Sequence, residues 1–218
     1  MHIEIIIDTV CPWCFIGLKR LKDALIERPQ LRPTISYKPF LLDPTIPQGG
    51  IPKAKYILEK FRSNQHYENS INLVNEIGEQ EGLDLKLDMI KIIPNSLNSH
   101  CLVILGETIG KDHEILEEIM RAYFCYGYDI TNDEILCKIG KKYNLKEEAI
   151  MNYINNEKYK KLLHKETMRL RNQGINGVPT YILNNSYAIS GAQDKVALLK
   201  IIDLASAENS NSNLQSFI

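Results

Sequence analysis

Hydrophobic and polar residues alternate along the first segment of the chain, residues 2–8. Ile3, Ile5 and Ile7 share one face, and Ile6 makes the centre of the segment apolar on the other face as well. Period-two alternation is typical of a β-strand, and apolar residues on both faces are typical of a strand inside a sheet. The pattern therefore predicts an inner strand at the start of the chain.

Roughly helical spacing of apolar residues replaces this alternation after residue 11 and continues as far as Ile26. Arg28-Pro29 then disfavours a longer helix, because proline has no backbone N–H to donate. A second alternating segment, 34–42, predicts another strand, which Pro39 confines to a sheet edge or distorts near its end. The order strand, helix, strand predicts a βαβ unit.

Mainly helical patterns fill the following segment, 43–165. It opens with a loop rich in proline and glycine. The apolar periodicity behind this loop predicts helices over 53–64, 66–81, 96–109, 112–126, 132–143 and 146–155. Because strand patterns return only after this segment, we expect 43–165 to be an inserted all-helical domain.

The C-terminal part returns to mixed structure. A charged helix is predicted over 158–173, and two short apolar runs, 180–183 and 187–190, predict a hairpin across Asn184-Asn185. A last helix is predicted over 193–205. The segment 208–218 is rich in Asn and Ser and lacks periodicity, so we expect a flexible tail there.

Composition and charge limit the classes of partner. With 26 Lys and Arg against 27 Asp and Glu, the formal net charge is −1, which produces no global field for nucleic acid or anionic lipid. No apolar run reaches the length of about 18 residues that spans a membrane, and the N-terminus lacks the features of a signal peptide. We therefore expect a cytoplasmic protein that binds neither nucleic acid nor membranes.

One close pair, Cys11 and Cys14, stands out among the five cysteines. It lies between the predicted first strand and first helix, where unpaired backbone N–H groups and the helix dipole stabilise a thiolate. Pro12 suits the first helical turn, which needs no N–H at that position. From one turn away, Cys14 is placed to attack a mixed disulfide formed on Cys11. The pattern predicts thiol–disulfide exchange.

Two other interpretations of the pair remain open. Both thiols can be ordinary buried core residues, or they can belong to a zinc site. A structural zinc site needs four ligands, and no second close pair of cysteines exists, so we expect no metal. The remaining cysteines lie in helical patterns and are expected to be small buried apolar residues: Cys101, Cys125 and Cys137.

Cys11-Pro12-Trp13-Cys14, followed by Phe15-Ile16-Gly17, resembles the DsbA-type thioredoxin-like superfamily, specifically its cytoplasmic FrnE-like branch. Further similar segments follow in the same order and spacing: 95–96 with His100, 122–130, 174–179 and 190–193. The resemblance implies an α/β fold in which a discontinuous thioredoxin-like domain, 1–42 and 166–207, is interrupted by the helical domain 43–165. Related enzymes in the superfamily are 2-hydroxychromene-2-carboxylate isomerase and the kappa-class glutathione transferases.

The resemblance also implies a substrate groove beside the two cysteines. It implies that the Val178–Pro179 peptide bond is cis, which leaves the backbone of Val178 free to pair with an extended substrate segment. Thr180 would border the same groove. Asn95 and His100 resemble a segment that approaches the active site from the helical domain; otherwise they are a helix cap and a satisfied polar residue at the domain interface.

Trp13 departs from the family pattern. Periplasmic DsbA-type oxidants carry His at this position, so their strongly oxidising potential does not carry over. We expect Pro12 and Trp13 to contact the substrate, with Trp13 as a surface for an apolar group. Asp8 precedes Cys11 by three residues and is either a turn acid or, if buried under the motif, a group that tunes a thiol pKa or relays a proton.

These residues support one main function and two alternatives. The main one is a disulfide oxidoreductase acting on protein or low-molecular-weight thiols and disulfides, with no tightly bound cofactor and with glutathione as a co-substrate. The first alternative is a glutathione-dependent isomerase or transferase, although those relatives usually place Ser at the position of Cys11. The second is a chaperone-like module that holds unfolded chains. Family analogy alone suggests a homodimer.

Overall fold

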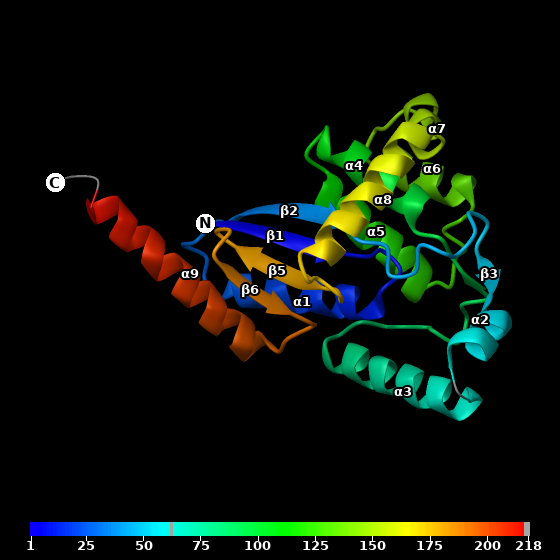
Figure 1. The fold of residues 1–218 in the computed structure, drawn as a ribbon, viewed down its shortest axis with the longest axis horizontal. Helices are drawn as coiled ribbons and strands as arrows, with labels where there is room; N and C mark the ends of the chain where they lie inside the picture. Colours follow the sequence, from blue (N-terminus) through cyan, green and yellow to red (C-terminus); the bar gives the residue numbers. More distant parts are fainter. Residues whose placement is uncertain (62, 216–218) are drawn as a thin grey trace.

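A mixed four-stranded sheet with the order β2-β1-β5-β6 forms the centre of the fold (Figure 1). The computed structural model describes residues 1–61 and 63–215, with side chains as far as residue 207. β1 (His2–Ile7) pairs in parallel with β2 (Thr34–Pro39) and antiparallel with β5 (Thr180–Leu183), which pairs antiparallel with β6 (Tyr187–Ser190). β1 is therefore an inner strand and β2 an edge strand, as the sequence predicts.

The connections between these strands also follow the sequence. Helix α1 (Pro12–Ile26) joins the parallel strands β1 and β2 and completes the predicted βαβ unit. Asn184 and Asn185 both have positive φ angles, 51° and 57°. This backbone conformation is required in the tight turns that suit antiparallel hairpins, so it explains the turn between β5 and β6.

The six helices predicted for the insertion are all present, with shifted ends. They are α2 (Lys53–Lys60), α3 (Asn64–Gln80), α4 (Leu97–Glu107), α5 (Asp112–Phe124), α6 (Asp133–Lys142) and α7 (Glu147–Ile154). α8 (Glu157–Asn172) then leads back to the sheet. The predicted boundary between 165 and 166 falls inside α8, and the division of the chain into domains stays a prediction.

Two parts of the helical segment differ from the prediction. The helix predicted over 53–64 ends at Lys60, because Phe61 is extended and the Ser63 side chain accepts the His66 N–H at 3.2 Å to begin α3. Two short strands, β3 (Ile51–Pro52) and β4 (Ile92–Ile93), pair antiparallel outside the main sheet. Such short strands leave no periodic signal in the sequence.

The last helix, α9 (Lys195–Gln215), is longer than the predicted helix over 193–205. Leu198, Ile202 and Ala205 give its first part a buried apolar face, whereas the sequence of residues 206–215 is mostly polar and leaves no periodic signal, which explains the shorter prediction. Side chains from residue 208 onward and the residues 216–218 lie outside the described part of the chain. The flexible tail predicted over 208–218 therefore stays a prediction. Within the described residues, no helix is long and apolar enough to cross a membrane.

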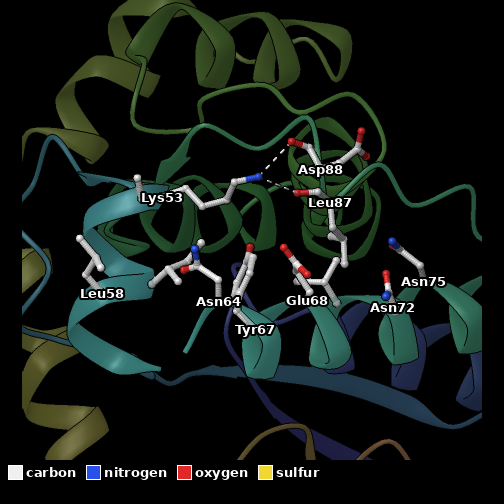
Figure 2. Close-up of a pocket in the computed structure, with 12 residues that line it drawn as sticks. Lys53, Leu58, Asn64, Tyr67, Glu68, Asn72, Asn75, Leu87 and Asp88 are labelled. Carbon is white, nitrogen blue, oxygen red and sulfur yellow. Dashed lines mark hydrogen bonds between the residues drawn. The ribbon is translucent and has the colours of Figure 1, made fainter. Parts of the chain in front are cut away.

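Helices α2 and α3 stand beside the rest of the insertion and border a cavity of about 550 Å³ (Figure 2). Its opposite wall is the segment 87–88, whose backbone carbonyl groups accept hydrogen bonds from Lys53. The open space in this part of the insertion is therefore the cavity between α2, α3 and the segment 87–88.

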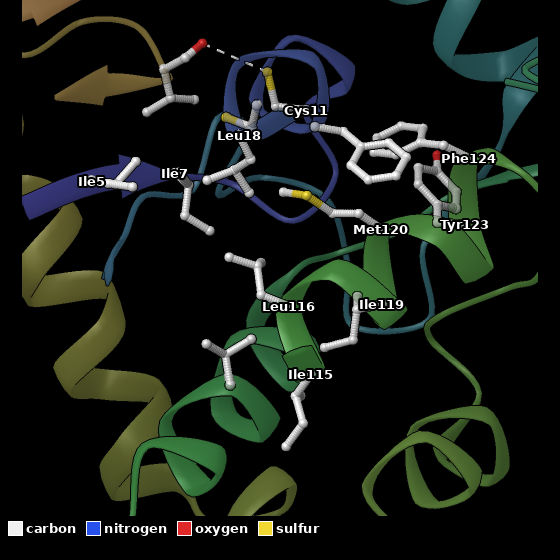
Figure 3. Packing of buried hydrophobic residues seen from close by; sticks show 14 of the residues in the cluster. Ile5, Ile7, Cys11, Leu18, Ile115, Leu116, Ile119, Met120, Tyr123 and Phe124 are labelled. Carbon is white, nitrogen blue, oxygen red and sulfur yellow. Dashed lines mark hydrogen bonds between the residues drawn. The ribbon is translucent and has the colours of Figure 1, made fainter. Parts of the chain in front are cut away.

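The main core lies between β1 and α5 (Figure 3). Ile5 and Ile7 of β1 and Leu116 and Ile119 of α5 are fully buried. Burying an aliphatic side chain of this size stabilises the folded state by about 1.5–3 kcal/mol. β1 is also paired with β2 on one edge and with β5 on the other, so the turn that follows it starts from a rigid support.

Candidate active site

Cys11 lies where β1 turns into α1. Its N–H donates to the Asp8 carbonyl at 3.1 Å, and its own carbonyl accepts the Cys14 N–H at 3.0 Å. Cys11 is the N-cap residue with an extended backbone, and Pro12 is the first helical residue. Its thiol therefore stands at a helix N-terminus, where the helix dipole favours negative charge.

The loop before β5 approaches the Cys11 sulfur. The Cys11 thiol donates to the Val178 carbonyl with a sulfur–oxygen distance of 3.6 Å (Figure 3). The peptide bond between Val178 and Pro179 is cis. Thr180 follows directly, and its hydroxyl donates to the Gly177 carbonyl at 2.9 Å. The structure thus brings Val178, Pro179 and Thr180 to the side of α1 that carries the cysteines.

Cys14 differs from Cys11 in its surroundings. It is fully buried, whereas Cys11 keeps 4% of its surface exposed. Burial raises the pKa of the Cys14 thiol well above its usual value, and the hydrogen bond with Cys11 and the negative charge of a Cys11 thiolate raise it further. Both cysteines are free thiols. The two thiols therefore differ: Cys14 holds its proton more firmly than an ordinary thiol, and Cys11 stands at the helix N-terminus.

Gly17 allows α1 to pack closely against the loop and β5. A Cβ atom at this position would lie 2.3 Å from the Tyr181 hydroxyl and 2.8 Å from Pro179 Cγ. Real Cβ atoms do not tolerate such distances, so only glycine fits. Close packing thus explains the glycine in the family-like segment Phe15-Ile16-Gly17, and this packing is visible only in the structure.

Asp8 lies buried beneath the motif, 1% exposed. Its carboxylate accepts the Leu42 N–H at 2.7 Å and the Val10 N–H at 3.3 Å. His100 Nε2, which is buried, lies 3.3 Å from Asp8 Oδ1, but the geometry is not that of a hydrogen bond. After burial and Cys11, Asp8 affects the pKa of Cys14 in two opposite ways: a backbone hydrogen bond lowers it, and the smaller effect of the carboxylate charge raises it. Asp8 is therefore buried, which is the condition for it to tune a thiol pKa or relay a proton.

Both the nitrogen and the oxygen of the Asn95 side-chain amide bond to backbone groups. It donates to the Ile46 carbonyl at 2.5 Å and accepts the Leu97 N–H at 2.9 Å, which serves the first turn of α4. His100 lies in α4 and is 2% exposed. His100 therefore lies under the motif, close to Asp8, whereas the Asn95 amide is bonded to backbone groups of Ile46 and Leu97. Substrate contact by either residue stays a prediction.

A cavity of about 160 Å³ opens beside Pro12, and sequence reasoning missed it. Its wall is mostly apolar and includes Tyr56 of α2, Tyr67 of α3 and Tyr123 of α5. Tyr123 lies within the similar segment 122–130, but the three tyrosines are too far apart along the chain to signal a common site. Trp13, by contrast, is half-buried and packs against the core.

The other cysteines occupy ordinary buried positions. Burial raises the pKa of each of their thiols, to about 11 for Cys101. A thiol that remains protonated is a poor nucleophile. In the described part of the chain, no three His, Cys, Asp or Glu side chains are grouped so as to hold a metal ion. The remaining cysteines are Cys101, Cys125 and Cys137.

A family model described as a DsbA-like thioredoxin domain matches residues 2–203. Among solved structures, a probable DsbA oxidoreductase from Streptomyces coelicolor superposes with a TM-score of 0.85. The two sequences are 22% identical, and the match covers 95% of this chain and 91% of the other. At this identity the likeness shows the fold, which is the predicted thioredoxin-like fold with a helical insertion.

Two further structures match over nearly their whole length. 2-hydroxychromene-2-carboxylate isomerase is 14% identical with a TM-score of 0.71, covering 99% of this chain and 98% of the other. The cytosolic disulfide reductase DsbM from Pseudomonas aeruginosa, solved with glutathione, is 16% identical with a TM-score of 0.66, covering 98% and 100%. At these identities both likenesses show the shared fold, as the sequence predicts for the two kinds of enzyme.

Proposed function

We propose that this chain, which belongs to the DsbA-like thioredoxin domain family, is a thiol–disulfide oxidoreductase that uses Cys11 and Cys14. The observation that carries the proposal is the asymmetry of the pair. Cys11 caps a helix N-terminus beside Val178, while Cys14 is fully buried with a raised pKa one turn away. One thiol is thus suited to attack and the other to hold its proton until the second step.

The reaction balances with two thiols and one disulfide. The Cys11 thiolate attacks a substrate disulfide, forms a mixed disulfide and expels one substrate sulfur as a thiolate, which takes up a proton. Cys14 then loses its proton and attacks the Cys11 sulfur. The second substrate sulfur leaves as a thiol, the substrate has gained two electrons, and the enzyme holds a Cys11–Cys14 disulfide. The reverse sequence oxidises a dithiol.

Asp8 and His100 are the groups that we assign to the proton of Cys14. Asp8 is buried under the motif, and His100 Nε2 lies 3.3 Å from its carboxylate. Two backbone N–H groups, those of Val10 and Leu42, hold the Asp8 carboxylate in place. Asp8 is therefore suited to receive the Cys14 proton when the mixed disulfide is resolved.

The proposed substrates are protein or low-molecular-weight disulfides and thiols. Substrate would lie against the Val178 backbone, Pro179 and Thr180, with Pro12 and Trp13 on the other side of the Cys11 sulfur. Glutathione is the proposed co-substrate that restores the dithiol, and no tightly bound cofactor takes part. The cytosolic reductase DsbM supports a small thiol partner and a cytoplasmic location. A homodimer stays a proposal from family analogy.

The decisive test is an equilibrium titration of the purified protein in glutathione redox buffers. Trp13, the single tryptophan, gives a fluorescence signal inside the motif, and trapping of free thiols gives an independent one. We expect a reversible two-electron transition that either Cys11→Ser or Cys14→Ser abolishes. Its midpoint shows whether the protein tends to reduce or to oxidise.

Activity assays on the same cysteine variants separate the alternative functions. A glutathione-dependent isomerase or transferase needs one reactive position, so its activity survives Cys14→Ser. A chaperone-like module keeps its holding activity after both cysteines are replaced. A protein without any two-electron transition would contradict the oxidoreductase proposal.

A further inference from the structure

Two cavities bordered by α3 lie next to each other. The cavity beside Pro12 and the larger cavity between α2 and α3 share three lining residues, Tyr67, Ile71 and Leu87. We call the combined space the α3 groove. It begins next to the cysteine motif and runs along one side of α3 (Figure 2). Because the groove starts beside Pro12, which directly follows Cys11, it is placed to hold a group attached to the substrate disulfide.

The lining of the α3 groove changes along its length. Near Pro12 it is apolar and aromatic, whereas the cavity between α2 and α3 also presents the side-chain amides of Asn64, Asn72 and Asn75, spread along α3 (Figure 2). Among the described residues, no group bonds to Asn75 Oδ1, which is buried. An amide side chain offers both a donor and an acceptor, which matches the backbone of a polypeptide. The groove thus combines a pocket for an apolar side chain with groups for a peptide backbone.

Charge argues against glutathione in the α3 groove. Among the described residues of its wall, Lys53 is the one cation, and its ammonium group already donates to the Asp88 carbonyl at 2.9 Å. Asp8, Glu68 and the side chain of Asp88 are acidic and lie on the same wall. Glutathione carries two carboxylates, so this wall repels it, whereas a neutral or basic peptide is accepted.

We infer that the α3 groove binds an extended, neutral or basic polypeptide segment that flanks the reactive cysteine of a protein substrate. This inference rests on the proposed oxidoreductase function. An apolar side chain of the segment enters the aromatic cavity beside Pro12, and its backbone reaches the amides on α3. The preferred substrates are therefore flexible protein chains, and glutathione disulfide reacts without using the groove.

The test compares rate constants for reduction of two symmetric disulfides by the reduced protein. One is oxidised glutathione. The other is the disulfide of a neutral peptide of about eight residues with one terminal cysteine and a central leucine, which spans roughly 26–29 Å when extended. Peptides with the cysteine at either end are used. We expect the better peptide to react at least about tenfold faster than glutathione disulfide, a difference of about 1.4 kcal/mol.

A matched pair of variants localises the effect. Asn72 and Asn69 are both exposed residues of α3, and only Asn72 lines the groove. We expect Asn72→Tyr to lower the ratio of the peptide rate to the glutathione rate by about fivefold or more, roughly 1 kcal/mol. Asn69→Tyr should leave the ratio unchanged. Peptides shortened to two residues should lose their advantage and their sensitivity to Asn72→Tyr.

Failure of the oxidoreductase function and failure of polypeptide binding in the α3 groove give different results. If neither disulfide is reduced, the oxidoreductase function itself is wrong. If both are reduced but at equal rates, or if Asn72→Tyr leaves the ratio unchanged, the oxidoreductase function stands and the α3 groove is not the binding site of the polypeptide.

Discussion

Asp8 places a negative charge beneath a thiol that burial already keeps protonated. Removing that charge by Asp8→Asn should lower the pKa of Cys14, because a nearby carboxylate disfavours the thiolate. The measurement is the pH dependence of Cys14 alkylation, followed by mass spectrometry of the cysteine peptides. Asp23→Asn serves as the control and should leave the Cys14 profile unchanged, because Asp23 lies in α1 and pairs with Lys19. A Cys14 pKa that stays the same in Asp8→Asn would show that the two groups do not interact.

Tyr181 carries a buried hydroxyl that has no hydrogen-bond partner among the described residues. Burial, followed by the negative charge of Cys14, raises the pKa of this tyrosine. An unsatisfied buried polar group costs about 1–3 kcal/mol. We therefore expect Tyr181→Phe to increase the free energy of unfolding by about 1 kcal/mol in urea titrations.

The control for this prediction is Tyr123→Phe. Tyr123 is also buried, but its hydroxyl donates to the Ile92 carbonyl at 3.4 Å. Its loss should be neutral or destabilising. A decrease in stability for Tyr181→Phe would mean that the Tyr181 hydroxyl has a bonding partner, such as a buried water.

Single residues differ in how far the sequence reveals them. Cys11 and Cys14 are predictable because their chemistry and their spacing within one helical turn are local. The burial of Asp8 and its approach to His100 depend on how α4 packs under β1, which no local pattern encodes. The role of Gly17 is hidden for the same reason, because its neighbours Pro179 and Tyr181 come from the other end of the chain.

At the scale of elements, α1 and β5 meet through Gly17. Gly17→Ala gains helix propensity worth about 0.5–1 kcal/mol. However, its new Cβ atom would meet the Tyr181 hydroxyl and Pro179, and such overpacking costs typically about 1–3 kcal/mol. The clash is the larger effect, so we expect a net loss of stability in urea titrations. A shift of Pro179 would also move Val178, whose carbonyl bonds to the Cys11 thiol. The variant should therefore also slow the reaction of Cys11 with disulfides.

A double-mutant cycle identifies the atom responsible. In the Tyr181→Phe background the hydroxyl at 2.3 Å is absent, so Gly17→Ala should be less destabilising there than in the wild-type protein. Equal losses in both backgrounds would assign the strain to Pro179 instead.

Elements with a strong apolar period are recovered from the sequence, and elements held by a few bonds are not. The hairpin strands β5 and β6 begin and end where the pattern predicts. The end of α2 at Lys60 is set by the extended Phe61 and by the Ser63 cap, which interrupt a continuous helical pattern. That interruption separates α2 from α3, and the α3 groove lies between these two helices.

At the scale of the whole molecule, the candidate site combines segments that are distant in the sequence. Arg171 of α8 donates to the Leu41 and Leu42 carbonyls and stacks over Phe40, while Leu42 N–H binds the Asp8 carboxylate. The helix that returns from the insertion thus supports the segment above the motif. The two cysteines and the insertion are predictable from the sequence. The contacts that join Arg171, the segment 40–42 and Asp8 are not, because no periodicity connects these residues.

The whole molecule should lose stability in alkaline solution, because several buried acids are protonated in the folded state. Burial raises the pKa of Cys101 from 9.0 to about 11, and it also raises the pKa values of Cys14, Tyr37, Tyr123 and Tyr181. Since the folded pKa values exceed the unfolded ones, the unfolded chain releases its protons first. Stability is therefore complete below about pH 9 and falls as pH rises through the folded values.

Cys101 accounts for a separable part of this alkaline loss. A rise in its pKa from 9.0 to about 11 corresponds to about 3 kcal/mol lost between these pH values. Urea unfolding of Cys101→Ala should give a flatter decline over this range. Val103→Ala in the same helix removes buried atoms without a titrating group, so it should lower stability equally at every pH. If Cys101→Ala instead declines in parallel with the wild-type protein, then Cys101 does not remain protonated in the folded state, and the buried tyrosines and Cys14 account for the pH dependence.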